Sequence, residues 1–143
     1  MNAFGEEVIV ENAEAAITKA CEMTGAEIDN FTAAPIYFSE EKKGRHEWIV
    51  EFKKVPGNVD QFTHLLDKEL RSINSDYDAK RSSDLALMAP ILHCVEQGTF
   101  YSWMKRRGKL GGQHKVPRLS NTREYVDDIL EMIGKADYKQ VDT

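Results

Sequence analysis

The spacing of apolar residues changes several times along the chain, and each change marks a predicted element. Between Asn12 and Gly25 the apolar residues recur three and four positions apart, as on one face of a helix. Asn12 is a favourable N-cap and Gly25 a favourable terminator, so the pattern predicts a helix over residues 13–24. The residues just before it, 7–10, favour a short β-strand.

Residues 27–52 predict a β-hairpin. Apolar, aromatic and β-branched residues favour a strand over 27–38, where Pro35 indicates a sheet edge or a bulge. The polar run over 39–45 predicts the turn. Alternation over 47–52 then predicts a second strand with one apolar face, which carries Trp48, Val50 and Phe52.

The most regular helical pattern follows a Pro-Gly pair. Asn58 and Gln61 have capping-box spacing, and apolar residues at helical spacing continue to Ile73. Residues 74–84 are polar and rich in turn formers, so they predict a turn region. Residues 91–95 predict a further strand.

Two more helices are predicted near the C-terminus. Thr99 caps a short helix that ends at Gly108, and Asn121 with Glu124 forms a second capping box for a helix that ends at Gly134. The predicted order is therefore β-α-β-β-α-β-α-α, with a loop before the last helix. This order indicates the α+β class, a small mixed or antiparallel sheet with amphipathic helices packed on it.

Length and composition fit one folded domain. The chain has 143 residues, of which 41% are hydrophobic and 30% charged, too apolar a composition for a disordered protein. We expect a domain over residues 1–134 and a polar, frayed tail over 135–143. No segment approaches the roughly 20 apolar residues of a membrane helix, and the acidic N-terminus is unlike a secretory signal, which favours a cytoplasmic location.

Charge is distributed unevenly. The net charge is −5, but residues 105–118 contain six Lys or Arg and no acid, which leaves 13 basic and 24 acidic residues, or −11, elsewhere. Such a segment indicates local attraction of an anion. Gly111 and Gly112 allow close approach of a backbone or ligand, while Lys115 and Arg118 flank a Val-Pro pair that stiffens the chain. A phosphate-binding loop and a solvated basic turn both agree with this pattern.

Other catalytic and metal-binding motifs are not found in the sequence. The four histidines lack zinc-protease spacing, and there is no GxSxG nucleophile elbow. Cys21 and Cys94 have no metal-type spacing, so no CxxC zinc site or disulfide framework is expected, and both favour burial as small hydrophobes. The RNA-recognition signature is absent, and strand 47–52 would carry acids where phosphates approach.

Several segments resemble a known family. They are, in chain order, NAFGEE at 2–7, ENAE at 11–14, TAAP at 32–35, HEW at 46–48, LRSINSDY at 70–77, GTF at 98–100 and QHKVPR at 113–118. Together they resemble the C-terminal region of bacterial members of the Gretchen Hagen 3 family, whose plant members are auxin-inducible acyl acid amido synthetases. The resemblance spans nearly the whole chain.

The resemblance implies an adenylate-forming enzyme built of two parts. In that superfamily a large N-terminal domain binds ATP, Mg²⁺ and a carboxylic acid, and a small mobile C-terminal domain closes over the site. By this resemblance Gly5, Glu6 and Glu7 belong to the motif at which the small domain begins, directly after the hinge.

The resemblance also implies roles for residues 108–118, called the basic loop below. Lys115 resembles the lysine that this superfamily inserts into the adenylation site, where an ammonium stabilises charge on the phosphoryl oxygens. Gly111, Gly112 and Arg118 would then lie at the nucleotide, although Arg118 could instead orient the loop.

One departure from the family is large. The chain lacks the Ser/Thr/Gly-rich phosphate loop and the other N-terminal motifs. We therefore expect a fragment that is inactive alone, whose partner is the N-terminal adenylation domain of the same polypeptide and whose parent binds ATP and Mg²⁺ there. The product, amide or thioester, is left open. The alternative is a stand-alone interaction domain that uses its basic loop for a protein or nucleic-acid partner.

Overall fold

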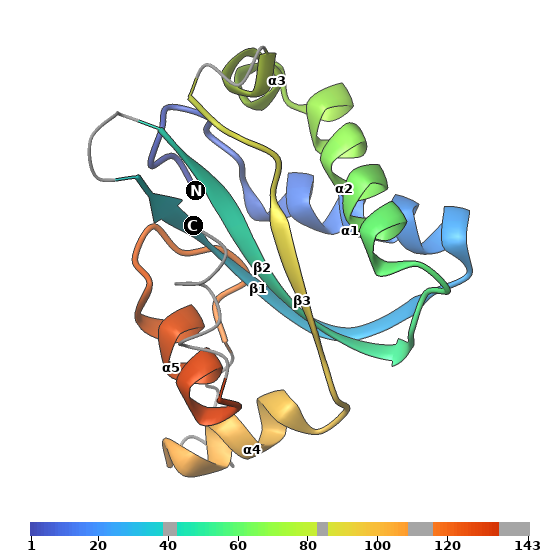
Figure 1. Ribbon diagram of the computed structural model, residues 1–143, viewed down its shortest axis with the longest axis vertical. Coiled ribbons are helices and arrows are strands. Elements are labelled where there is room, and N and C mark those ends of the chain that lie inside the picture. The colour runs from blue at the N-terminus through green and yellow to red at the C-terminus, as the bar shows by residue number, and fades with distance from the viewer. Residues whose placement is uncertain (39–42, 83–85, 109–115, 135–143) are drawn as a thin grey trace.

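A three-stranded sheet lies between two pairs of helices in the computed structural model, which describes residues 1–38, 43–82, 86–108 and 116–134 (Figure 1). The sheet order is β1-β2-β3, with β1 and β2 antiparallel and β2 and β3 parallel, so the sheet is mixed. The elements, in chain order, are α1 (Val10–Thr24), β1 (Glu27–Tyr37), β2 (Gly44–Lys54), α2 (Val59–Ile73), α3 (Ser75–Arg81), β3 (Ile91–Val95), α4 (Thr99–Arg106) and α5 (Glu124–Met132). The α+β class predicted from the sequence is confirmed.

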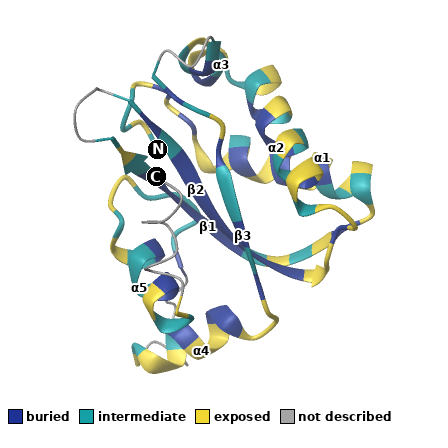
Figure 2. Ribbon diagram, in the orientation of Figure 1, coloured by how far each residue is buried: buried dark blue, intermediate teal, exposed yellow. Residues whose placement is uncertain are grey.

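The central strand β2 is buried on both faces and divides the interior into two cores (Figure 2). Trp48, Val50 and Phe52 pack with the apolar faces of α1 and α2 in the larger core, as their alternation predicted. Ile49 points to the opposite side and packs with α4 and α5 in the smaller core. Side chains alternate along a strand, so one strand supplies both layers.

The predicted strand at residues 7–10 is wrong. The helix α1 already begins at Val10, and the Asn12 side chain lies in its first turn, where Oδ1 accepts a hydrogen bond from the Ile9 N–H at 3.2 Å. The Val8 N–H donates to the Met1 carbonyl at 2.8 Å, and the Val8 side chain is fully buried. Local strand propensity is overridden because this backbone pairs with the chain's own N-terminus and forms no ladder.

The turn-rich region also differs from the prediction, because it contains the helix α3. The Asn74 side chain caps α3 by accepting the Tyr77 N–H at 2.8 Å. Tyr77 is buried, and its hydroxyl donates to Asp67 of α2 at 2.6 Å. This short polar helix is stabilised by contacts with α2, which local sequence patterns do not reveal.

Other predicted boundaries agree with the structure more closely. The Asn58 side chain accepts the Gln61 N–H at 2.9 Å, and Gly25 ends α1 with φ of 77°. Pro35 lies on β1, at the edge of the sheet order. The helix α5 begins at Glu124, with Arg123 as its N-cap, so Asn121 does not cap it. No helix in the described ranges has the length and apolar character needed to cross a bilayer.

Candidate functional site

The N-terminal segment, residues 1–9, contains the predicted start motif and is fastened to the sheet by a buried carboxylate. Glu6 is fully buried, and its Oε2 lies 2.6 Å from Nε2 of His46, which is 1% exposed on β2. Its Oε1 accepts the Phe4 N–H at 2.8 Å. Burial raises the pKa of Glu6, but the His46 and backbone hydrogen bonds outweigh burial and hold that pKa below its ordinary value.

The same segment contacts the chain that follows the basic loop. Asn2 donates its backbone N–H to Oδ1 of Asn121 at 2.9 Å, and Nδ2 of Asn121 donates to Oδ1 of Asn2 at 2.9 Å. The Asn121 side chain therefore links two parts of the molecule that are 119 positions apart in sequence. This contact replaces the helix cap that the sequence predicted for it.

The basic loop returns to the fold along β1. The residues 116–120, called the stalk below, follow the outer edge of that strand. The Ala33 N–H donates to the Arg118 carbonyl at 2.9 Å, and the Ser120 N–H donates to the Ala33 carbonyl at 3.1 Å. The Thr32 hydroxyl adds a 2.6 Å hydrogen bond to the Pro117 carbonyl. The stalk is thus held like a short added strand, with Val116 buried.

Arg118 lies on β1. Its Nη1 donates to Oδ1 of Asn30 at 2.7 Å, and its Cζ lies 4.7 Å from the centre of the Phe31 ring. This geometry is that of a stacked guanidinium with one hydrogen-bonded edge. The predicted residues Gly111, Gly112 and Lys115 lie outside the described residues.

The other end of the basic loop leaves from α4, where Arg107 bridges to α5. Its guanidinium lies 5.1 Å from the Trp103 ring centre and 5.4 Å from that of Tyr125. It also approaches Glu124 at 3.4 Å and Asp128 at 3.5 Å. Arg107 is therefore paired within the domain, which removes one charge from the basic surface that the nucleic-acid alternative requires.

A second buried carboxylate joins β2, β3 and α5. Glu47 is fully buried, with Oε2 at 2.7 Å from Nε2 of His93 and Oε1 at 2.5 Å from Nη2 of Arg123. Arg123 also donates to the Pro35 carbonyl at 2.9 Å and to Asp127 at 2.7 Å. Burial raises the pKa of Glu47, but hydrogen bonds from His93 and Arg123 more than offset it, so that the pKa lies below its ordinary value.

The two glutamates of β2, Glu47 and Glu51, therefore form contacts within the domain. Glu51 lies four residues after Glu47 on β2. Its carboxylate accepts the Phe100 N–H at 2.9 Å and the Gly98 N–H at 3.3 Å, at the start of α4. Sequence reasoning noted these acids but did not find their partners. The available signal was the presence of carboxylates at buried-face positions of a strand, where unpaired charges are rare. Across the described ranges, no group of three His, Cys, Asp or Glu could hold a metal ion.

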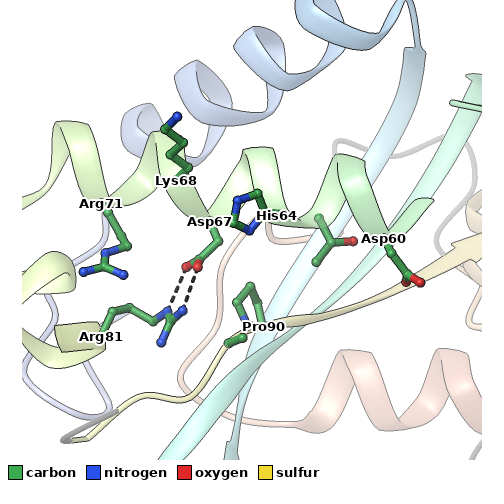
Figure 3. A pocket seen from close by; sticks show the side chains of 9 residues that line it. Asp60, His64, Asp67, Lys68, Arg71, Arg81 and Pro90 are labelled. Carbon is green, nitrogen blue, oxygen red and sulfur yellow. Dashed lines mark hydrogen bonds and ion pairs between the residues drawn. The ribbon is translucent and has the colours of Figure 1, made fainter. Parts of the chain in front are cut away.

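A cavity of about 410 Å³ lies between α2 and the chain leading into β3 (Figure 3). Its floor is the ion pair of Asp67 and Arg81, with Nε and Nη2 of the arginine at 2.9 and 2.8 Å from the carboxylate oxygens. Arg71, on its wall, donates from Nε to Asp78 at 2.6 Å. These pairs join α2 to α3, so Asp67, Arg71 and Arg81 have a structural role.

Comparison with known proteins agrees with this architecture. The GH3 family C-terminal domain matches residues 11–124. Two similar solved structures are described as "AtGH3.15 acyl acid amido synthetase in complex with 2,4-DB" and "GH3.15 acyl acid amido synthetase". Both have a TM-score of 0.64 over 85% of this chain, at 17% and 20% identity.

The chain spans 23% of the length of each of these two structures. No curated protein sequence matches it. The family resemblance inferred from the sequence is confirmed, because the family match covers well over half of the chain. The chain belongs to the GH3 (Gretchen Hagen 3) family, in which it corresponds to the C-terminal domain.

Proposed function

We propose that this domain is the C-terminal lid of an ATP-dependent ligase that activates a carboxylic acid as an acyl adenylate and conjugates it to an amine or amino acid. The observation that carries the proposal is the match of residues 11–124 to a GH3 C-terminal domain. The similar solved structures, described as acyl acid amido synthetases, support the choice of reaction class.

The proposed reaction has two steps. A carboxylate oxygen attacks the α-phosphorus of ATP, a new P–O bond forms, and pyrophosphate leaves. The amine nitrogen then attacks the acyl carbon, AMP leaves with the bonding electron pair, and the nitrogen loses a proton. ATP and Mg²⁺ would be held mainly by an N-terminal adenylation domain of the same polypeptide.

Lys115 is the residue of this chain that we assign to the first step. In that step negative charge builds on the phosphoryl oxygens and on the leaving pyrophosphate, and an ammonium placed there without water stabilises it. The residue that follows Lys115 is buried Val116, at the start of the stalk fixed on β1. A fixed backbone beside a catalytic residue lowers the entropic cost of placing that residue, which supports the assignment.

For Arg118 we assign an anchoring role. Its hydrogen bond to Asn30 and its stacking on Phe31 hold the stalk from the side of β1. Of the two roles that the resemblance allowed, this geometry favours loop orientation over phosphate contact. Gly111 and Gly112 complete the proposal as positions where the loop backbone approaches the nucleotide.

Lys115→Ala in the full-length enzyme tests this assignment, with Lys105→Ala as the matched control because Lys105 is exposed in the last turn of α4. The assay is acid-dependent exchange of pyrophosphate into ATP. We expect Lys115→Ala to lower the exchange rate by about 100-fold, the usual scale for one lost oxyanion donor, and Lys105→Ala to leave it near wild type. Exchange that is unchanged in Lys115→Ala rejects the role.

A further inference from the structure

Two buried glutamate–histidine pairs lie on β2, and they are fastened to different parts of the molecule. The pair of Glu47 and His93 joins the strand to β3 and, through Arg123, to α5. The pair of Glu6 and His46 joins the strand to the N-terminal segment. Both glutamates are fully buried, and the histidines are 1% and 9% exposed. The second pair therefore gives the N-terminal segment an attachment as buried as that between β2 and β3.

The backbone of the N-terminal segment is closed on itself around this attachment. The Gly5 N–H donates to the Asn2 carbonyl at 3.0 Å, and the Val8 N–H donates to the Met1 carbonyl at 2.8 Å. Gly5 has φ of 84° and Glu7 has φ of 47°, so the chain turns twice through left-handed conformations on either side of Glu6. A non-glycine residue holds such a conformation only where its surroundings determine it.

Side chains at both ends of the segment add to the attachment. Val8 is fully buried in the larger core, and the Phe4 ring packs 5.3 Å from the ring of Tyr37 on β1. Asn2 exchanges two hydrogen bonds with Asn121, directly after the stalk. Glu6 Oε2 lies 2.6 Å from His46 and Oε1 accepts the Phe4 N–H, so release of this buried carboxylate would break both contacts.

We infer that Glu6 and His46 fix the N-terminal segment to the sheet, so that in the proposed enzyme this segment moves as part of the domain. This inference rests on the proposed function, which requires the domain to move. It gives Glu6, in the motif at which the domain begins, the role of an anchor, with His46 as a positioning residue. The Asn2–Asn121 contact then joins the anchored segment to the residue that directly follows the stalk.

The unmodified chain offers the first test. Backbone ¹⁵N relaxation should give residues 4–9 order parameters of about 0.85, the value of rigid backbone and of the β2 amides in the same sample. Values below about 0.6, typical of a flexible terminus, would overturn the inference. This measurement needs no variant and therefore does not depend on the folding of one.

A pair of matched variants gives the second test. His46→Gln and His93→Gln each break one buried pair on β2, and amide hydrogen exchange by NMR reports both local and global opening. In His46→Gln we expect the Gly5 and Val8 amides to exchange at least about tenfold faster relative to the Val50 amide. In His93→Gln that ratio should stay at its wild-type value. Equal ratios in the two variants would show that His46 acts on global stability alone and would refute the anchor.

Neither the relaxation nor the hydrogen-exchange experiment measures catalysis, so both results are independent of the proposed reaction. If Lys115→Ala abolishes pyrophosphate exchange while residues 4–9 are flexible, the lid function stands and the anchor falls. If those residues are rigid but Lys115→Ala is silent, the anchor stands as a property of the fold and the lysine assignment falls.

Discussion

Arg123→Ala tests the energetic role of the buried carboxylate on β2. In the folded state Glu47 is fully buried and has two side-chain partners, His93 at 2.7 Å and Arg123 at 2.5 Å. Loss of one partner of a buried ion pair usually costs about 3–5 kcal/mol. His93 stays in place and the Arg123 side chain is 21% exposed, so the lower end of that range, about 3 kcal/mol, is expected.

Urea unfolding of the 143-residue chain, followed by Trp fluorescence, measures this cost. With a slope of about 1.5–2 kcal/mol/M, a loss of about 3 kcal/mol lowers the midpoint by roughly 1.5–2 M without a change in slope. The control is Arg106→Ala, at an exposed position in the last turn of α4, which should change the free energy of unfolding by less than about 0.5 kcal/mol. A midpoint for Arg123→Ala within 0.3 M of wild type, on the order of the error of the method, would refute the reasoning.

The pH dependence of this difference gives an independent check. The pKa of Glu47 is lowered in the folded state, since hydrogen bonds to His93 and Arg123 outweigh the effect of burial. Its stabilising contribution is therefore fully present above the unfolded-state pKa of about 4.3 and is lost as the pH falls through the lower folded-state pKa. The difference in unfolding free energy between wild type and Arg123→Ala should shrink over that acidic range. A difference that grows on acidification would contradict the assigned charge state.

Two further substitutions address α3 and the stalk. Tyr77→Phe removes the hydroxyl that donates to buried Asp67 at 2.6 Å, and urea unfolding should show a loss of about 1–2 kcal/mol; no loss would mean that Arg81 alone satisfies the carboxylate. Arg118→Gln removes the contacts with Asn30 and Phe31 and should cost about 1 kcal/mol in unfolding while KM for ATP changes little in the full-length enzyme. A raised KM with unchanged stability would assign Arg118 to the phosphate instead.

The elements that the sequence predicted well are those whose signal is local. The helix over α2 has both a side-chain cap at Asn58 and a continuous apolar face, and the hairpin has alternating residues on β2. Elements with distant determinants were missed. The helix α3 depends on Asp67, and residues 7–9 failed to form a strand because Val8 pairs with Met1 and the Glu7 carbonyl accepts from Asn74 at 3.1 Å.

The candidate site follows the same division. The spacing of glycines and cations marked the basic loop, but the position of Arg118 depends on Asn30, 88 residues away in sequence. The two glutamate–histidine pairs join residues 40 and 46 positions apart, and no sequence spacing specifies such a contact. Four acids are buried in the fold: Glu6, Glu47, Glu51 and Asp67. Each needs a partner, but the sequence does not show whether histidine, arginine or a backbone N–H supplies it.

We propose above that this domain is the lid of an enzyme that activates a carboxylic acid as an acyl adenylate. The direct measurement is the nucleotide product formed by the full-length enzyme with ATP, Mg²⁺, a panel of carboxylic acids and amino acids, with the conjugate identified by mass spectrometry. We expect AMP and pyrophosphate in equal amounts with an amide, all greatly reduced in Lys115→Ala. Formation of ADP and inorganic phosphate with the amide would contradict it, since that outcome requires an acyl phosphate in place of an acyl adenylate.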